Sequence, residues 1–573
     1  MHTPSSDPRA SVFYDYKIHR YRRPAEMDGE RRAKPVAIVG AGPIGLATAL
    51  DLARFGVPCV LLEEDLQVSE GSRAIVLTRR SLEILQQLGV EKPLIEKGLP
   101  WSQGRSFYKG QEIYKMLMPY DSDDRYLPGL NIQQQYIEEY LLGYCERHPL
   151  IDIRWGQRVV AIAQGDAAVT LGIDTPDGEY ELTAEWVVAA DGGRSTVRKL
   201  MQLRMEGRSY PGRFVIADIK AKIDLPTERL CFFDPAWNPG NNVLVHRQPD
   251  DLWRIDFRLP DGETEEQALE PALLKRRINA VLSMIKQEVE WQLDWATVYS
   301  ANTLTLGKFV HGRVLLTGDA AHLLPIFGVR GINTGLQDSN NLAWKLAFVI
   351  NGWAERPLLD SYSQERVQAA REICEEGGKS TRFMTPPSPG TRLLRDAVLS
   401  WSLSEDFLKD LMHWRTSRPH DYRDSSLNAF AEVDREFHGG VACGQPLRNI
   451  KLAANDHLFD AIGSKAGFHL LLFVGEEGLT RDLREILAAT ENPAFPIHPL
   501  IVAPAAPLGD PQADPIVGDA QGRTHSKYDA TPGTVYLIRP DLHVCARWRR
   551  ANPQQVLQAL RQATGFAEGC CLS

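Results

Sequence analysis

The chain has 573 residues, with 65 lysines and arginines against 74 aspartates and glutamates, a formal net charge of −9 at pH 7. This balance argues against a broad basic surface, so we expect no nucleic-acid partner. No apolar run reaches the length of a membrane span and the N-terminus has no signal pattern, which predicts a cytoplasmic protein without a membrane partner. The eight cysteines are scattered without a Cys-x-x-Cys pair, so neither a disulfide framework nor a metal site is predicted.

The first 33 residues mix aromatic, basic and acidic side chains without helical apolar spacing. Two interpretations stay open for this N-terminal extension. It is an arm that lies over the domain or over a neighbouring subunit, or it is a disordered leader.

A dinucleotide-binding pattern follows at once. Residues 36–39 are an apolar run typical of a buried parallel strand, and Gly40, Gly42 and Gly45 follow in Gly-x-Gly-x-x-Gly spacing. The first glycine allows a tight turn, the second a close pyrophosphate, and the third helix packing. A second strand ends at Glu63, where a carboxylate can accept both hydroxyls of an adenosine ribose. The pattern predicts an adenine dinucleotide; a glycine-rich turn without a ligand is the alternative.

Two later segments indicate which dinucleotide is bound. Residues 186–198 give a strand that ends in Asp191 and Gly192, and residues 311–319 give another that ends in Gly318 and Asp319. An aspartate at such a strand end can meet the ribityl chain of FAD, which NAD lacks. The glycine-rich residues 328–335 then open a helix, whose free amides and positive end suit an anionic ring. These motifs favour FAD over NAD.

The three motifs, in this order, resemble the family of single-component FAD-dependent aromatic hydroxylases, the fold group of p-hydroxybenzoate hydroxylase and phenol hydroxylase. The resemblance implies an α/β fold in which an FAD-binding Rossmann-like domain carries an inserted antiparallel substrate sheet. It also implies that Arg73 lies near the pyrophosphate, Gln134 and Asp319 contact the ribityl, and amides around residues 331–333 cradle the flavin ring. The implied FAD-binding residues are Gly40, Gly42, Gly45, Glu63, Arg73, Gln134, Asp191, Asp319, Gly331, Ile332 and Asn333.

For Asp191 the family associates its Asp-Gly motif with both FAD and pyridine nucleotide. The alternative for Asp191, and for Arg198 after it, is a helix cap with a surface ion pair.

The substrate sheet is expected at about residues 207–304, where short strands alternate with Pro and Gly breaks. By resemblance its residues line the phenol pocket. His246 and Arg247 point to opposite faces of one strand, so only one of them should reach that pocket. Either could instead be a solvent-facing strand residue.

Some positions depart from the family pattern. Ile75 stands where phenol hydroxylase has an aspartate acting on the phenol hydroxyl, and Ile326 replaces a second proline after Pro325. For His322 we expect a structural role. Arg330 stands where p-hydroxybenzoate hydroxylase has a lysine, and a guanidinium near the flavin would favour its anionic reduced form and an anionic substrate. An arginine turned to solvent or paired with a surface carboxylate is the alternative.

The domain boundaries are predicted at 1–33, 34–435 and 436–573, with a helical tail at about 340–435. The strand and helix order of the last segment resembles the thioredoxin-like domain of phenol hydroxylase. It lacks a redox cysteine pair, so we expect support of the fold or of subunit contact, with no dithiol chemistry.

The resemblance therefore implies an FAD-dependent monooxygenase of aromatic compound catabolism. It would hydroxylate a phenolic or heteroaromatic small molecule with NADH or NADPH and dioxygen, through a flavin hydroperoxide. A homodimer is an assembly that the resemblance allows. No catalytic residue is assigned firmly; the candidates are Arg330, His246 and Arg247. A reductase or halogenase of the same fold, or a non-catalytic flavin-binding protein, are the alternatives.

Overall fold

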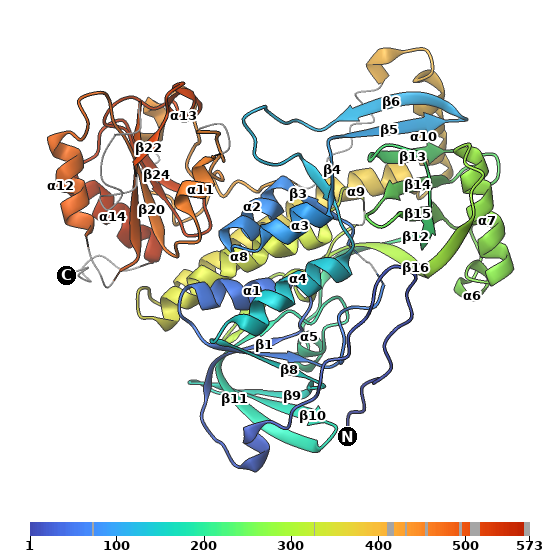
Figure 1. Ribbon diagram of the computed structural model, residues 1–573, viewed down its shortest axis with the longest axis horizontal. Helices are drawn as coiled ribbons and strands as arrows, with labels where there is room; N and C mark the ends of the chain where they lie inside the picture. Colours follow the sequence, from blue (N-terminus) through green and yellow to red (C-terminus); the bar gives the residue numbers. More distant parts are fainter. Residues whose placement is uncertain are drawn as a thin grey trace.

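A mostly parallel sheet carries the predicted cofactor motifs in the computed structural model (Figure 1). The structure describes residues 1–71, 74–325, 327–408, 418–429, 433–452, 456–491, 495–504 and 516–565, and the side chain of Pro211 is left out of the description. Five neighbouring strands run parallel, in the order β18 (Val314–Leu316), β11 (Gly178–Ala189), β1 (Lys34–Val39), β2 (Cys59–Glu63) and β8 (Ile151–Trp155). Their apolar side chains are buried, as expected for a sheet covered on both faces.

Shorter strands extend this sheet. β17 (Val310–His311) forms a hairpin with β18, and β9 (Arg158–Gln164) and β10 (Val169–Thr175) form an antiparallel extension of β11.

Long helices pack beside the parallel sheet. α1 (Pro43–Arg54) lies against both α4 (Gln134–Arg147) and α8 (Gly331–Ile350), and α8 packs on α9 (Leu358–Met384). The remaining helices of this part are α2 (Arg79–Gln87), α3 (Glu91–Lys97), α5 (Thr196–Leu200) and α10 (Pro389–Trp401). Figure 1 shows this helical layer between the other two parts of the molecule, the substrate sheet and the C-terminal sheet.

A second sheet of eight strands forms the region expected to bind substrate. Its order is β19-β16-β12-β15-β14-β13-β5-β6. The bounds are β19 (His322–Leu323), β16 (Trp291–Thr305), β12 (Glu206–Ala221), β15 (Leu252–Arg258), β14 (Asn242–Arg247), β13 (Arg229–Phe233), β5 (Gln103–Tyr108) and β6 (Gln111–Leu117). β5 and β6 come from well before residue 207 in the sequence. They belong to this sheet because β5 pairs in parallel with β13.

This sheet has two different faces. The helices α6 (Glu265–Ala268) and α7 (Pro271–Met284) cover an apolar face. The opposite face packs toward the FAD-motif region, together with a small sheet of β3 (Val76–Thr78), β7 (Gly129–Asn131) and β4 (Leu99–Trp101).

The C-terminal sheet is separate and has five strands. Its order is β22 (Ile516–Gly518), β21 (Ile497–Ala503), β20 (Phe468–Phe473), β23 (Val535–Ile538) and β24 (Val544–Trp548). β20 and β21 are parallel, whereas β23 and β24 are an antiparallel hairpin. The helices α11 (Leu458–Ile462), α12 (Arg481–Thr490), α13 (Arg523–Lys527) and α14 (Pro553–Thr564) accompany it. Its described cysteines, Cys443 and Cys545, are both free.

The N-terminal segment lies over the body of the protein. Tyr16 is buried, and its hydroxyl accepts hydrogen bonds from Arg9, from the Gly71 amide and from Gln135 at 3.0, 3.2 and 2.9 Å. Asp294 on β16 accepts three further bonds from this segment, from the Arg9 guanidinium, the Ser11 hydroxyl and the Val12 amide. The segment therefore joins the substrate sheet to the loop that follows β2.

A buried ion network joins the C-terminal domain to α8 and α9. Arg539 donates to both oxygens of Glu365 on α9, at 2.6 and 2.9 Å, and also to Asp541. Lys345 on α8 donates to the same Glu365 carboxylate at 2.7 Å. All four side chains are at most 5% exposed. Arg539 and Lys345 hold the pKa of Glu365 well below its usual range, even though burial acts to raise it.

We expect Arg539→Met to destabilise the fold strongly. The substitution would leave two buried carboxylates without their main counter-charge, which costs about 3–5 kcal/mol in comparable buried pairs. Urea unfolding followed by circular dichroism measures the change in the unfolding midpoint. Arg481→Met is the matched control, because Arg481 pairs with Glu485 on an exposed helix surface, and this variant should unfold like the parent. Equal midpoints for both variants would contradict the prediction.

Candidate functional site

Four of the predicted residues lie at one edge of the parallel sheet. Gly40 directly follows β1, Glu63 ends β2, Asp191 comes two residues after β11, and Asp319 comes three residues after β18. Because these neighbouring strands are parallel, their carboxyl ends meet at the same edge. This is the edge at which α/β sheets bind nucleotides.

The glycine turn after β1 is packed too closely for side chains. Gly40 has φ +102°, and a Cβ there would lie 2.6 Å from the Ala190 carbonyl oxygen. A Cβ on Gly45 would lie 1.9 Å from the Gly40 carbonyl oxygen. At Gly42, which caps α1, a Cβ would meet nothing within 4 Å. The first and third glycines are therefore needed by the protein itself, while the second borders open space, as a phosphate cradle requires.

The third motif packs onto the first through one side chain. Ile44, at the start of α1, would contact a Cβ placed on Gly318 at 3.2 Å and one placed on Gly335 at 2.7 Å. The Gly-Asp turn after β18 and the first turns of α8 thus lie directly against the glycine-rich turn. Motifs separated by more than 270 residues form one continuous surface.

Glu63 is held in place by the backbone of this surface. Its carboxylate accepts the Ala41 amide at 2.7 Å and the Asp65 amide at 3.2 Å. Burial raises the pKa of Glu63 to about 7, and the two amide bonds act in the opposite direction. A carboxylate retains further lone pairs, so both hydroxyls of a ribose can still be accepted here.

Asp191 and Asp319 lie in two loops that Arg198 connects. Arg198 donates to the carbonyls of Ala320 and Gly193, at 3.0 and 2.6 Å. The carboxylate of Asp191 caps α5 by accepting the Val197 amide at 3.0 Å, and burial raises its pKa. Asp319 is exposed at the sheet edge. One oxygen of Asp191 thus helps to cap α5, while its Oδ1 is buried without a hydrogen-bond partner among the described residues. Arg198 donates to backbone carbonyls.

The start of α8 offers backbone amides. The first hydrogen bond of the helix runs from the Thr334 amide to the Arg330 carbonyl, so the amides of residues 331–333 precede the helical ladder. A Cβ on Gly331 would meet nothing within 4 Å. The Asn333 side chain is fully buried and accepts the Thr78 amide and the Ser81 hydroxyl, at 2.8 and 2.6 Å. Its side chain thus fixes α8 against β3 and α2, which leaves only its amide to face a ligand.

Arg330 is buried and does not turn to solvent. Its side chain is 2% exposed, its Nε donates to the Phe327 carbonyl at 3.1 Å, and its Nη1 lies 3.9 Å from Glu376 Oε2 on α9. The guanidinium therefore has a carboxylate partner behind the loop that opens α8.

Arg73 lies outside the described residues. Gln134, at the start of α4, accepts the Ala74 amide through Oε1 at 3.0 Å, and its Nε2 donates to Glu138 at 2.7 Å. Glu138 in turn accepts the Ser69 amide at 2.7 Å. Through these bonds α4 holds the backbone at Ser69 and at Ala74.

A polar row crosses the inner face of the substrate sheet. Cross-strand pairing places Arg229, His246, Arg254 and Asp218 side by side on four adjacent strands. Arg254 and Asp218 form a buried bidentate ion pair at 2.8 and 2.7 Å. Burial, followed by the two neighbouring arginines, lowers the pKa of His246 to about 3, so this imidazole is neutral at ordinary pH.

His246 and Arg247 point to opposite faces, as strand alternation predicts. His246 shares the inner face, while Arg247 lies on the α7 side and donates to the Leu225 carbonyl at 2.8 Å. Only His246 therefore faces the FAD-motif region.

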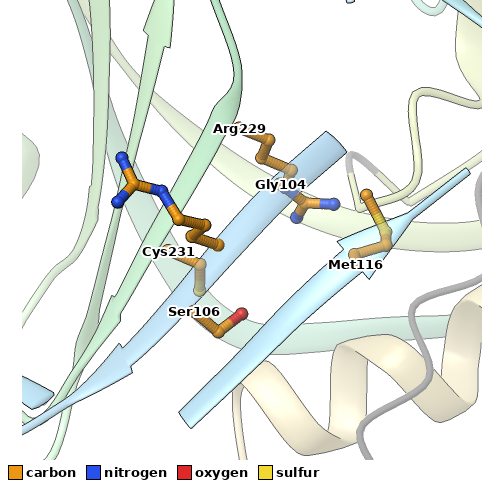
Figure 2. A pocket seen from close by; sticks show the side chains of 6 residues that line it. Gly104, Ser106, Met116, Arg229 and Cys231 are labelled. Carbon is orange, nitrogen blue, oxygen red and sulfur yellow. The ribbon is translucent and has the colours of Figure 1, made fainter. Parts of the chain in front are cut away.

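Several polar atoms of this inner face are buried and lack a hydrogen-bond partner among the described residues. On the sheet they are His246 Nδ1 and Asp256 Oδ1, with both side-chain polar atoms of Gln248 at the end of β14; next to the sheet they are Asn131 Oδ1 and Gln133 Oε1. Buried polar atoms normally have a partner, which here would be water or a ligand. Figure 2 shows the nearby pocket where β13 meets β5, with Arg229, Cys231, Ser106 and Met116 around it. Its volume is about 10 Å³, which holds a single water and no aromatic ring.

A cluster of buried charged and polar side chains lies behind the Gly-Asp turn, and the sequence did not predict it. Asp338 on α8 accepts the Gly318 amide at 3.2 Å, His322 Nε2 lies 2.6 Å from the same carboxylate, and Arg366 donates to it at 2.6 Å. Burial opposes ionisation, but Arg366 and His322 lower the pKa of Asp338. His322 therefore supports the turn, in line with the structural role expected for it. The sequence shows Asp338 one helical turn after Gly335. Its partners, Gly318, His322 and Arg366, can be identified only from the fold.

The arrangement defines a flavin-dependent oxidoreductase: a dinucleotide edge, a helix start with free amides, and a substrate sheet facing both. Residues 33–376 match the family model described as FAD binding domain. The chain is 34% identical over 384 residues to a 3-(3-hydroxy-phenyl)propionate/3-hydroxycinnamic acid hydroxylase of Burkholderia cenocepacia, covering 66% of this chain and 69% of that one. This protein belongs to the family of FAD-dependent aromatic hydroxylases.

A second relative and two solved structures extend the similarity over nearly the whole chain. A 3-(3-hydroxy-phenyl)propionate/3-hydroxycinnamic acid hydroxylase of Klebsiella pneumoniae is 29% identical over 545 residues, which is 93% of this chain and 95% of the relative. The flavin-dependent monooxygenase PieE, solved with FAD and substrate, is similar with a TM-score of 0.77 at 21% identity, covering 93% of this chain and all of that one. Aklavinone-11 hydroxylase, solved with FAD and aklavinone, gives 0.72 at 23% identity, with 94% and 100% coverage.

The protein is thus a hydroxylating flavin monooxygenase with FAD as cofactor and NADH or NADPH as co-substrate, as the sequence predicted. The α/β fold prediction is confirmed as well. In the described part of the chain, no helix is long and apolar enough to cross a membrane. Nor does that part contain a group of three metal-ligating side chains.

We expect FAD affinity to depend on pH through Glu63. Ribose hydroxyls donate to the charged carboxylate, so binding favours the ionised form. Affinity should therefore be full above the apoprotein pKa of about 7 and fall as pH drops below it, by up to about tenfold per pH unit. Fluorescence titration of the apoprotein with FAD at pH 6, 7 and 8.5 measures this dependence. Glu63→Gln should bind more weakly at pH 8.5 and show a flat profile; a flat profile in the parent would count against the assignment.

Proposed function

We propose that the enzyme hydroxylates a phenol that carries a carboxylate side chain, such as a 3-(3-hydroxyphenyl)propionate. Dioxygen as the oxidant, a homodimeric assembly and a cytoplasmic location belong to the same proposal. The observation that carries the substrate class is the buried polar row with Arg229 and His246, on the sheet face directed at the FAD motifs. Both relatives named above are hydroxylases of such an acid, and one matches this chain over almost its full length.

The inner face suits an anionic aromatic ligand in two respects. Arg229 is buried, and desolvation lowers its pKa, so an anionic ligand group beside it would stabilise its charged form. Beside this polar row lies an apolar layer that contains Phe214, Phe327 and Met384, with the Phe214 and Phe327 rings 5.2 Å apart. An aromatic ring would pack on this layer while its acid group reaches the polar row.

The FAD-binding residues are proposed in the roles that the geometry permits. Gly40, Gly42 and Gly45 form the pyrophosphate turn, Glu63 accepts the ribose hydroxyls, and Asp319 meets the ribityl chain. Asp191 is assigned to the cofactor through its buried Oδ1, while its other oxygen helps to cap α5.

Further roles lie around the flavin ring. In line with the resemblance, we assign Gln134 to the ribityl chain and Arg73 to the pyrophosphate, and the amides of Gly331, Ile332 and Asn333 to the ring. Arg330 acts from behind the loop, with its charge shared by Glu376. Bound FAD supplies the redox chemistry, and this chain supplies position, charge and exclusion of water.

Substrate-stimulated oxidation of NAD(P)H tests the proposed function. We expect 3-(3-hydroxyphenyl)propionate to stimulate oxidation strongly, with one dioxygen consumed per hydroxylated product. Its uncharged amide should stimulate less, with a KM at least several-fold higher, because a charge-assisted bond is worth about 1.5–3 kcal/mol. Oxygen-electrode traces and product analysis provide the measurement. Equal KM values for acid and amide would remove the carboxylate from the proposal, and oxidation without product would remove hydroxylation.

Asp256 should give the binding of an anionic substrate a pH dependence. Burial raises the pKa of this inner-face carboxyl to about 7. It is therefore neutral below pH 7, and it becomes a negative charge facing the substrate as pH rises through that value. We expect the Kd of 3-(3-hydroxyphenyl)propionate, read from the flavin absorbance, to increase between pH 6 and 8.5. Asp256→Asn should abolish this increase without affecting FAD binding, and a parent Kd that is constant over this range would contradict the prediction.

A further inference from the structure

A large basic groove lies at the outer end of the substrate sheet. Its volume is about 630 Å³, within the range of small-molecule sites. Its walls come from Arg213 at the bulge in the middle of β12, from the turn between β15 and α6, and from the segment that leads into α10. Three arginines line it, Arg213, Arg258 and Arg392, with Asp261 as the one carboxylate among the described lining residues.

The charges of this groove are only partly compensated. Arg258 is 5% exposed; it donates to Asn241 and Asp261, at 3.0 and 3.1 Å, and its buried Nε has no partner among the described residues. Arg392 lies 3.6 Å from the same Asp261, whose side chain is 77% exposed. Arg213 donates to the Glu263 carbonyl, which carries no formal charge. The lining therefore has two positive charges in excess, in a chain with a net charge of −9.

The groove is preformed. Pro260, Pro386, Pro387 and Pro389 are among its lining residues, and proline fixes the backbone angle φ. A wall that does not need to be ordered on binding costs less conformational entropy. The positive end of α10 begins at Pro389, behind a Ser388 cap, and adds to the potential of the arginines.

The groove also connects to the flavin side of the sheet. Arg258 pairs across strands with Phe214, and Phe214 packs on Phe327 in the loop that precedes α8. Met384 belongs to the same apolar layer, two residues before the groove prolines begin. A ligand anchored in the groove would therefore lie at the rim of the layer that separates it from the flavin loop.

We propose that this groove binds the phosphate groups of the pyridine nucleotide. The inference rests on the proposed function, because it assigns a place to that reaction's co-substrate. The sequence has no second glycine-rich fingerprint, so side chains have to hold these phosphates in place of a helix start. Arginine forks match phosphate oxygens, and an excess of two positive charges matches a pyrophosphate. An open groove with solvent access also suits a co-substrate that binds and leaves in each turnover.

Direct binding to the FAD-loaded protein tests the proposal without turnover. The ligands are inorganic pyrophosphate, NAD+, NADP+ and 3-(3-hydroxyphenyl)propionate, titrated by calorimetry. Arg392→Met, at a side chain 43% exposed, should weaken pyrophosphate and dinucleotide binding by about five- to tenfold. Asp261→Asn removes the one opposing charge and should tighten the same ligands several-fold. Arg481→Met, on the exposed face of α12, is the matched control and should bind like the parent.

Two results would overturn the proposal. Pyrophosphate and dinucleotide Kd values that are unchanged in both Arg392→Met and Asp261→Asn would show that the groove binds no phosphate. A change confined to the aromatic acid would assign the groove to the substrate carboxylate instead. Neither result depends on product formation, so a failure of hydroxylation would be seen separately.

Discussion

Close contact between backbone turns is the constraint on which the cofactor edge depends. Gly40 lies against the Ala190 carbonyl, Gly45 lies against the Gly40 carbonyl, and Ile44 fits against Gly318 and Gly335. A side chain at Gly40, Gly318 or Gly335 would push two motifs apart, and one at Gly45 would disrupt the glycine-rich turn itself. The sheet brings the strand ends to one edge, but this packing closes them into a single surface. Glu63, Asp319 and the first amides of α8 then face that surface from three sides.

Behind that surface, buried charges hold the turns in position. Asp338 accepts a bond from the Gly318 amide and is itself held by Arg366 and His322. Arg366 also donates to Tyr422, in the segment that leads to the C-terminal sheet, at 2.7 Å. The Gly-Asp turn is thus supported from behind by side chains of α8, β19 and α9. The Tyr16 hydroxyl plays a comparable role on the other side, where it holds the Gly71 amide.

The sequence predicted what depends on local patterns and missed what depends on pairing across strands. The spacing of Gly40, Gly42 and Gly45 and the acid at Glu63 are local, and they identified the dinucleotide edge. Alternation along one strand also separated His246 from Arg247 correctly.

The polar row could not be predicted in the same way. It requires the register of the four strands β12, β13, β14 and β15, which the sequence pattern of each strand alone does not give. Whether Arg330 meets solvent or a carboxylate depended on Glu376, which lies on a helix whose packing the sequence does not specify.

The network around Glu365 bears on how such a protein can be divided. The Arg539 guanidinium comes from the C-terminal sheet, whereas Glu365 and Lys345 belong to helices of the FAD-binding region. Cutting the chain between the FAD-binding region and the C-terminal domain would not give two independently stable domains. It would expose Lys345 on α8 and Glu365 on α9, whose side chains are buried in the intact protein. α8 is also the helix that begins at the flavin loop. Chimeras that exchange the C-terminal domain between relatives should therefore transfer Arg539 together with its partners Glu365 and Lys345. Otherwise the helices that position the cofactor site would lose the ion pairs that stabilise them.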